Sequence, residues 1–176
     1  VRAGFTPALP LVPMELLAQI VSFFRCYMDG REKFEALAHI LWDRQEQEFV
    51  VRVPAQKVTH ARIDADLSKD AYPEDRYLHY IDIHSHNSME AKFSHVDDED
   101  EQATRIYIVV GRLDKFFPDV TVRMSCGGTY LELDPGCVLE SLGGVFPQEW
   151  RANVEVAHRQ RPVLRPLGEQ FWEDRS

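Results

Sequence analysis

The sequence predicts one α/β domain in which a mixed β-sheet is flanked by helices. Three observations support this fold class: an amphipathic helical stretch comes first, several β-rich stretches follow, and a second helical stretch interrupts them. This order is typical of one mixed α/β layer and not of a regular doubly wound sheet. The chain of 176 residues is long enough for one domain with a sizeable core and short for two. We expect a single domain over 1–176, with its core at about 12–140 and a C-terminal extension over 141–176.

The first element is a helix predicted within residues 13–30. Pro13 suits a first helical turn, where its missing N–H costs nothing, and Asp29 and Gly30 end the run. The apolar residues that recur at helical spacing are Leu16, Leu17, Ile20, Val21 and Phe24. The run therefore predicts an amphipathic helix.

The β-rich stretches that follow predict the sheet. Strands are expected at 33–42, 48–54, 57–64, 77–86, 106–114 and 120–134. The polar turn "DRQEQ" joins the first two as a candidate hairpin. The stretch 77–86 is rich in tyrosine and isoleucine, which favour strands. Gly127 and Gly128 break the last stretch into two strands.

Two further helices are predicted between and after these strands. One begins near Ser94, because serine is a good N-cap and acidic residues follow in the first turn, where the helix dipole favours them. A short helix is predicted within 147–160.

Composition narrows the classes of partner. The formal net charge is −9, with 29 acidic against 20 basic residues. Nucleic acids and anionic membranes require a basic surface, so neither is an expected partner. The cysteines, Cys26, Cys126 and Cys137, are odd in number and lack C-x-x-C spacing, which indicates reduced thiols in a cytoplasmic protein. No apolar run reaches the length of a membrane span, and three prolines within residues 1–13 argue against an export signal.

The strongest chemical signal is a candidate metal site. His84 and His86 stand two apart at the end of a predicted strand, so both imidazoles share one face. Asp97 lies one turn into the helix predicted from Ser94, from which its carboxylate can turn back toward the histidines. Two imidazoles and one carboxylate leave a fourth tetrahedral position for water, as in catalytic zinc sites.

The segment "HSHNSMEAKFSHVD", residues 84–97, resembles the H-[ST]-H-x7-S-x2-D signature of the JAMM (MPN-plus) metalloproteases. It looks most like short bacterial JAB-type proteins such as PRTRC system protein A, in which HSHN-S-M and a following D-D-x-D-E recur. The resemblance implies an MPN (cytidine-deaminase-like) domain with a curved mixed sheet, and Zn²⁺ held by His84, His86 and Asp97. It also implies a zinc-dependent isopeptidase that removes a ubiquitin-like protein from conjugates or processes its C-terminus.

The same resemblance implies the partners. Such proteins occur in bacterial operons beside E1-like and sometimes E2-like enzymes and a ubiquitin-like protein, some of them antiphage defence systems. The expected partners are therefore the C-terminal tail of a ubiquitin-like protein, its conjugates and these E1-like or E2-like proteins.

The family's general base is a glutamate that opens the strand after the first helix, which here nominates Glu35, with Glu32 a near alternative. The glycines expected after that glutamate are Ala38 and Trp42 in this chain, and Asn87 stands where many members have proline. In the implied mechanism, Glu35 takes a proton from a zinc-activated water and delivers it to the departing lysine amine.

Ser94 has two interpretations, which are compatible. The resemblance implies that its hydroxyl donates to the oxyanion of the tetrahedral intermediate. The local pattern indicates a plain helix N-cap.

Two further acidic features have simpler interpretations. Asp82 shares a strand face with His84 and could accept a hydrogen bond that orients the imidazole. The run Asp98, Glu99, Asp100 and Glu101 is expected to be a solvated helix face at the favourable end of the dipole.

Three other functions compete with the isopeptidase. H-x-H hydrolases of the amidohydrolase and PHP types need larger barrels and further histidines downstream, where this chain offers only His158 beyond the helix. A non-catalytic MPN module that scaffolds a complex is the stronger rival, although such modules typically lack a ligand. A third alternative keeps the metal chemistry and acts on a small-molecule or cysteine adduct of a sulfur-carrier protein.

Overall fold

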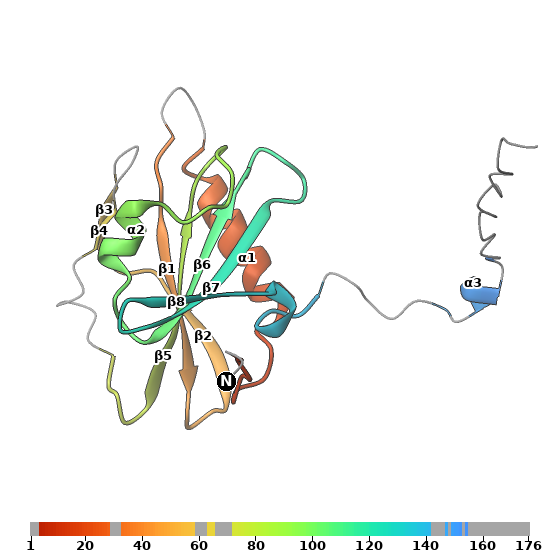
Figure 1. Cartoon of the computed structure of the whole chain (residues 1–176), viewed down its shortest axis with the longest axis horizontal. Coiled ribbons are helices and arrows are strands. Elements are labelled where there is room, and N and C mark those ends of the chain that lie inside the picture. The colour runs from red at the N-terminus through yellow and green to blue at the C-terminus, as the bar shows by residue number, and fades with distance from the viewer. Residues whose placement is uncertain are drawn as a thin grey trace, which may run out of the picture. The chain divides into compact units, whose positions relative to one another are not determined.

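The computed structural model contains a six-stranded, curved, open mixed sheet (Figure 1). The structure describes residues 4–28, 33–58, 63–65, 72–141, 147, 149–152 and 154. The strand order is β2-β1-β5-β6-β7-β8, and β3 and β4 form a separate two-stranded sheet. Only the β5–β6 pair of the six-stranded sheet is parallel; the other pairs are antiparallel.

The elements follow the predicted order. The strands are β1 Leu37–Asp43, β2 Glu48–Arg52, β3 Gln56–Val58, β4 Ile63–Ala65, β5 Tyr77–Ser85, β6 Arg105–Gly111, β7 Asp119–Cys126 and β8 Thr129–Leu133. The described helices are α1 Met14–Arg25, α2 His95–Asp100, the 3-10 turn η1 Pro135–Cys137 and α3 Glu149–Ala152. The mixed α/β class is therefore confirmed.

One face of the sheet is apolar and packs against α1. Cross-strand partners lie on the same face, so the register aligns Ile40, Ile81, Ile106 and Met124 in one row across four strands. The apolar residues of this sheet face pack against the apolar side of α1 in a single core. The helix contributes Leu17, Ile20, Val21 and Phe24 to this core. The helical spacing of these four residues, read from the sequence, is the reason that α1 lies on this face.

The opposite face carries polar side chains. A second set of cross-strand rows joins Leu37 to His84, and His39 to Asp82, and Tyr107 follows Asp82 on β6. Because strands alternate their side chains between faces, burying the apolar rows against α1 leaves these polar groups together on the other side.

The topology brings three chain segments to one edge of the sheet. The parallel strands β5 and β6 end at the same edge. Because β1 runs antiparallel to β5, its first residue Leu37 pairs with His84, near the end of β5. The segment before β1, the end of β5 and the loop that leads to α2 therefore meet there.

Among the predicted boundaries that differ from the structure, two concern segments around the site. The stretch 57–64, expected as one strand, contributes to two short strands, β3 and β4, which pair with each other. No glycine or proline in 57–64 marks this break, so the pattern alone could not reveal it. Glu35, expected inside a strand, lies two residues before β1.

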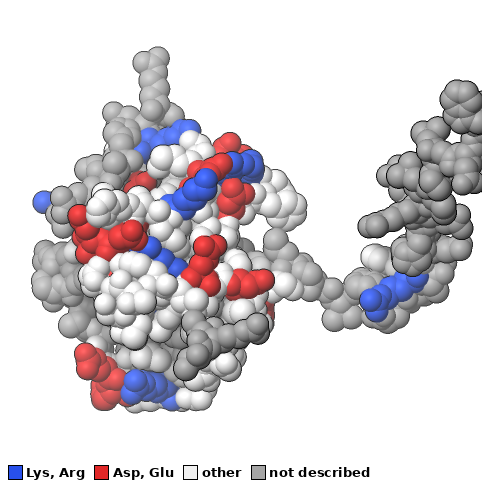
Figure 2. Space-filling model, in the orientation of Figure 1, with Lys and Arg blue, Asp and Glu red and all other residues white. Residues whose placement is uncertain are grey.

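The chain divides into two units, Val1–Leu142 and Gly143–Ser176. In the first, Val12 forms a parallel bridge with Leu139, and the Val12 N–H donates to the Val138 carbonyl at 2.8 Å. Within the second, the described residues include the short helix α3. In the face shown in Figure 2, acidic and basic side chains are interspersed. None of the described helices has the length and apolar character needed to cross a membrane.

Candidate metal centre

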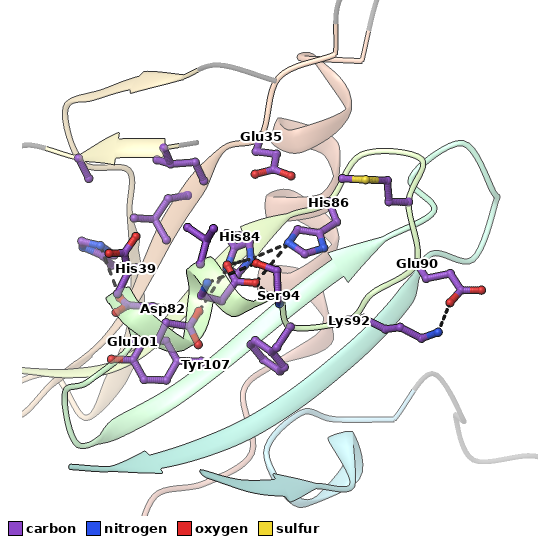
Figure 3. A pocket seen from close by; sticks show the side chains of 18 residues that line it. Glu35, His39, Asp82, His84, His86, Glu90, Lys92, Ser94, Glu101 and Tyr107 are labelled. Atoms are coloured by element: carbon purple, nitrogen blue, oxygen red, sulfur yellow. Dashed lines mark hydrogen bonds and ion pairs between the residues drawn. The ribbon is translucent and has the colours of Figure 1, made fainter. Parts of the chain in front are cut away.

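His84 and His86 lie at the carboxyl end of β5, on either side of Ser85. The strand pairing continues past its end, because the His86 N–H donates to the Val110 carbonyl at 2.8 Å. Both histidines are buried, and their Nε2 atoms lie 3.1 Å apart. The alternation of side chains along β5 thus brings both imidazoles to one point, as the H-x-H spacing predicts (Figure 3).

Asp97 reaches the same point from α2. Ser94 is the N-cap of this helix: its Oγ accepts from the Asp97 N–H at 3.3 Å, and its own N–H donates to Asp97 Oδ2 at 2.5 Å. This reciprocal capping box confirms the predicted helix start. It directs the Asp97 carboxylate toward the strand end, with Oδ1 3.3 Å from His84 Nε2 and Oδ2 3.7 Å from His86 Nε2.

The three side chains could hold a divalent metal ion. Ligand bonds of about 2.0–2.2 Å in tetrahedral geometry place neighbouring donor atoms about 3.4 Å apart, and the three separations here are 3.1, 3.3 and 3.7 Å. Burial lowers the pKa of His84 to about 4 despite the opposing charge of Asp97, and burial likewise lowers the pKa of His86. Both imidazoles are therefore neutral near pH 7, which is the form that binds metals.

Glu35 faces this group across the cavity (Figure 3). Its side chain is buried, and burial, followed by the charge of Asp97, raises its pKa to about 7. Its position is set by the neighbouring Ala36, whose N–H donates to Ser85 Oγ at 3.0 Å and whose carbonyl accepts from the Ser85 N–H at 3.0 Å. The alternative base, Glu32, falls outside the described residues.

A cavity of about 910 Å³ contains all five predicted site residues: Glu35, His84, His86, Ser94 and Asp97. One end is lined by Glu90 and Lys92, and the other by His39, Asp82 and Tyr107 (Figure 3). Met89 also lines the cavity. The volume lies within the range of about 300–1,000 Å³ typical of ligand pockets and is larger than a single metal ion with its water requires.

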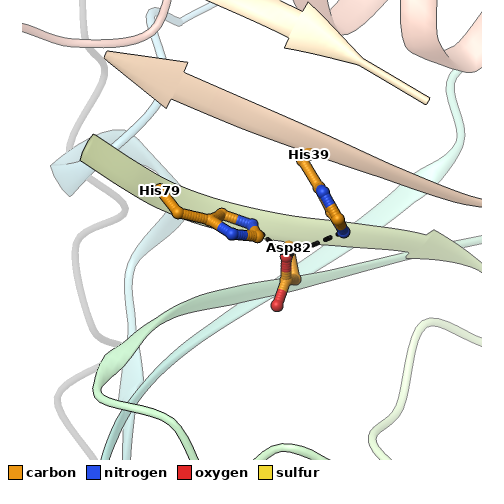
Figure 4. Close-up of side chains that lie close together, drawn as sticks. All are labelled: His39, His79 and Asp82. Carbon is orange, nitrogen blue, oxygen red and sulfur yellow. Dashed lines mark hydrogen bonds and ion pairs between the residues drawn. The ribbon is translucent and has the colours of Figure 1, made fainter. Parts of the chain in front are cut away.

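A second group of possible ligands, His39, His79 and Asp82, lies on the same face (Figure 4). Asp82 Oδ1 is 2.6 Å from His79 Nε2 and 3.5 Å from His39 Nε2. However, Arg105 Nη1 is 2.8 Å from His79 Nδ1 and 3.1 Å from Asp82 Oδ2. A fixed guanidinium here already supplies the positive charge, so this group is poorly suited to a metal cation.

The role predicted for Asp82 is corrected by these contacts. Its hydrogen bonds go to His79 and Arg105 rather than to His84. Burial opposes ionisation of Asp82, but the hydrogen bond with His79 and the charge of Arg105 lower its pKa overall. The prediction that Asp82 shares a strand face with His84 is correct, but the prediction that His84 is its hydrogen-bond partner is wrong.

The solvated helix face predicted over residues 98–101 is also partly wrong. Glu99 and Asp100 are exposed, but Glu101 is 7% exposed. Its Oε1 lies 3.6 Å from His84 Nδ1, and its Oε2 accepts from Arg123. Burial raises the pKa of Glu101 to about 8, against the lowering effect of Arg123. Glu101 lies four positions after Asp97, and residues four apart share one side of a helix. This spacing is a sequence signal that Glu101 lies on the side of the helix that carries Asp97.

No protein-family model matches this chain, and no curated protein matches it significantly. The chemistry of the site is therefore the basis for assigning a function.

Proposed function

We propose that this chain is a zinc-dependent hydrolase with a JAMM-type (MPN) domain. In this proposal it cleaves the isopeptide or peptide bond after the C-terminal residue of a bacterial ubiquitin-like protein. The observation that carries the proposal is the convergence of His84, His86 and Asp97 within 3.7 Å, with Glu35 in the same cavity. The spacing H-S-H-x7-S-x2-D and the spatial grouping are separate observations that agree.

The donor set favours zinc over harder cations. Two neutral imidazoles and one carboxylate suit Zn²⁺, whereas Mg²⁺ and Ca²⁺ prefer oxygen ligands. When bound, a zinc ion would polarise the scissile carbonyl and lower the pKa of water to about 7.

Glu35 supplies the proton transfers. A carboxylate whose pKa is raised to about 7 by burial can both accept and return a proton near neutral pH. It takes one proton from the attacking water as the C–O bond forms, and delivers it to the amine as the C–N bond breaks. The products are a free carboxyl terminus and a free lysine amine, so atoms and charge balance.

Ser94 can stabilise the oxyanion without leaving its structural position. Its Oγ already accepts from the Asp97 N–H, so the hydroxyl hydrogen remains available to donate. A donor that is fixed in advance and aimed at developing charge contributes about 3 kcal/mol in comparable enzymes.

The test uses a bacterial ubiquitin-like protein joined through its C-terminus to a lysine of a reporter protein. We expect cleavage that is blocked by a chelator, restored by zinc and reduced about 10²–10⁴-fold in Glu35→Gln. Glu90→Gln is the matched control, because Glu90 lines the same cavity but is half-exposed and paired with Lys92 and Arg112. An intact reporter in the presence of zinc-loaded protein would overturn the isopeptidase and favour the scaffold.

A further inference from the structure

The helix that carries Asp97 has no apolar anchor. α2 is six residues long, and none of its residues is buried. Helices this short are not stable alone and depend on tertiary contacts. The position of Asp97 must therefore be maintained by polar contacts between α2 and the sheet.

Arg123, on β7, makes those contacts from the polar face of the sheet. Its Nη1 donates to Asp98 Oδ1 at 2.5 Å, and its Nε and Nη2 donate to Glu101 Oε2 at 2.9 and 2.5 Å. Its guanidinium lies between two rings, 3.9 Å from the centroid of Phe93 and 4.0 Å from that of Tyr130. We call these five residues the Arg123 clamp.

The chemistry of the clamp requires arginine. Only a planar guanidinium can stack between two rings while its edge donates to two separate carboxylates. Tyr130 adds a direct contact to the helix, since its hydroxyl donates to the Asp98 carbonyl at 2.6 Å. The side chain of Arg123 is only 7% exposed, so these interactions are weakly screened by solvent.

The clamp contacts two of the three candidate ligands. Asp98 is the chain neighbour of Asp97, so its attachment to Arg123 limits movement of the Asp97 carboxylate. Glu101 presents its other oxygen, Oε1, to His84 Nδ1 at 3.6 Å. A carboxyl oxygen on that side of the ring favours the tautomer in which Nδ1 carries the hydrogen and Nε2 faces Asp97.

We propose that Arg123 is a positioning residue for the metal centre, acting through Glu101 on His84 and through Asp98 on Asp97. This inference rests on the proposed zinc site. Arg123 itself touches neither the metal ligands nor the cavity, so its effect is on metal affinity and coordination geometry.

Zinc affinity measured by competition with a chelator tests the proposal. We expect Arg123→Met to raise the zinc dissociation constant about 10–100-fold, the range seen when residues that support metal ligands are removed. Arg76→Met is the matched control. Arg76 makes two bonds to Asp43, at 2.9 and 2.7 Å, and stacks on Tyr77, but it lies beside the opposite end of β1 from the site. This control is expected to change the constant less than about 2-fold, and an equal effect of both variants would overturn the proposal.

A double variant separates positioning from general stability. Arg123→Met alone leaves the buried Glu101 carboxyl group without its hydrogen-bond donors, whereas adding Glu101→Met removes that unpaired buried group. We expect the melting temperature to recover in the double variant, while its zinc affinity stays about 10–100-fold weaker than that of the wild type. Recovery of both would show that the clamp has a structural role only, and would overturn the inference.

A second variant and a spectroscopic signal keep the test valid if the methionine variants fold poorly. Arg123→Lys retains a charge for Glu101 but cannot donate to Asp98 at the same time. We expect an intermediate loss of zinc affinity and altered visible absorption bands in the cobalt-substituted protein. Bands and affinity identical to those of the wild type would contradict the proposal.

The controls also separate this inference from the proposed function. A wild-type protein that binds no zinc would overturn both. A wild-type protein and an Arg123→Met variant that bind zinc equally would overturn only the role of Arg123.

Discussion

Among single residues, Glu35 shows most directly how function and stability oppose each other. Its burial places a carboxylate where the charged form is poorly solvated, and this raises its pKa to about 7. The same shift makes it an effective base at neutral pH. A group with a raised pKa contributes stability that is fully present below the unfolded pKa of 4.5 and is lost as the pH rises through about 7.

We therefore predict that metal-free Glu35→Gln is more stable than metal-free wild type at pH 8, by about 1–2 kcal/mol after allowance for solvent screening. The difference should disappear at pH 4, where the wild-type carboxyl is protonated. Urea unfolding at pH 4, 6 and 8 in excess chelator measures it. A difference that does not vary with pH would show that ionisation of Glu35 is not its cause.

Ser94 combines two roles that substitutions can separate. Its Oγ caps α2, and its hydroxyl hydrogen is the proposed oxyanion donor. Replacing an N-cap serine by alanine costs about 1 kcal/mol, whereas glycine costs only a few tenths. Neither replacement has a hydroxyl.

We predict that Ser94→Ala and Ser94→Gly lower kcat equally, by about 10²–10³-fold, while only the alanine variant loses about 1 kcal/mol of stability. Steady-state kinetics on the fused reporter and thermal unfolding measure the two effects. An activity loss that followed the stability loss would assign Ser94 the capping role alone.

Between elements, the contact of β1 with the end of β5 determines where Glu35 lies. Ser85 is fully buried, and both its N–H and its Oγ bond to the backbone of Ala36. The serine between the two histidines thus links the metal-ligand strand to the segment that carries the base.

We predict that Ser85→Ala destabilises the protein by about 1–3 kcal/mol, because the buried Ala36 N–H loses its acceptor. Ser125→Ala is a matched control on β7: Ser125 is equally buried, and its Oγ has no hydrogen-bond partner among the described residues. That variant should be neutral or slightly stabilised in urea unfolding. Equal effects of the two substitutions would contradict this role for Ser85.

At the scale of the whole molecule, the described metal centre and apolar core lie within the unit Val1–Leu142. Val138 and Leu139, after the last strand, are 1% and 4% exposed and belong to the core. The segment after β8 therefore completes the packing against the start of the chain at Val12.

We predict that a chain ending at Leu142 keeps the zinc affinity and, within about 1 kcal/mol, the stability of the full chain. A chain ending at Asp134 should lose about 3 kcal/mol or more, because two buried apolar side chains are removed. Calorimetry and chelator competition measure both. Weaker zinc binding by the chain ending at Leu142 would show that residues 143–176 contribute to the site.

Local patterns in the sequence predicted much of the fold and of the site. The helical spacing in α1, the strand alternation, the Ser94 cap and the H-x-H pair depend on backbone geometry over a few residues, so they are visible in the sequence. The same patterns correctly placed His84, His86 and Asp97 near one another, because a strand end and the first turn of a helix each direct their side chains predictably.

Only the tertiary structure determined which acidic residues are buried and what they contact. Glu101 and Arg123 are 22 positions apart, and Asp82 and Arg105 are 23 apart. No short-range pattern connects such pairs, so the contacts of Glu101 with Arg123 and of Asp82 with Arg105 could not be predicted. Burial and pKa depend on these long-range neighbours, because the free energy of a charge is set by the groups that replace its water.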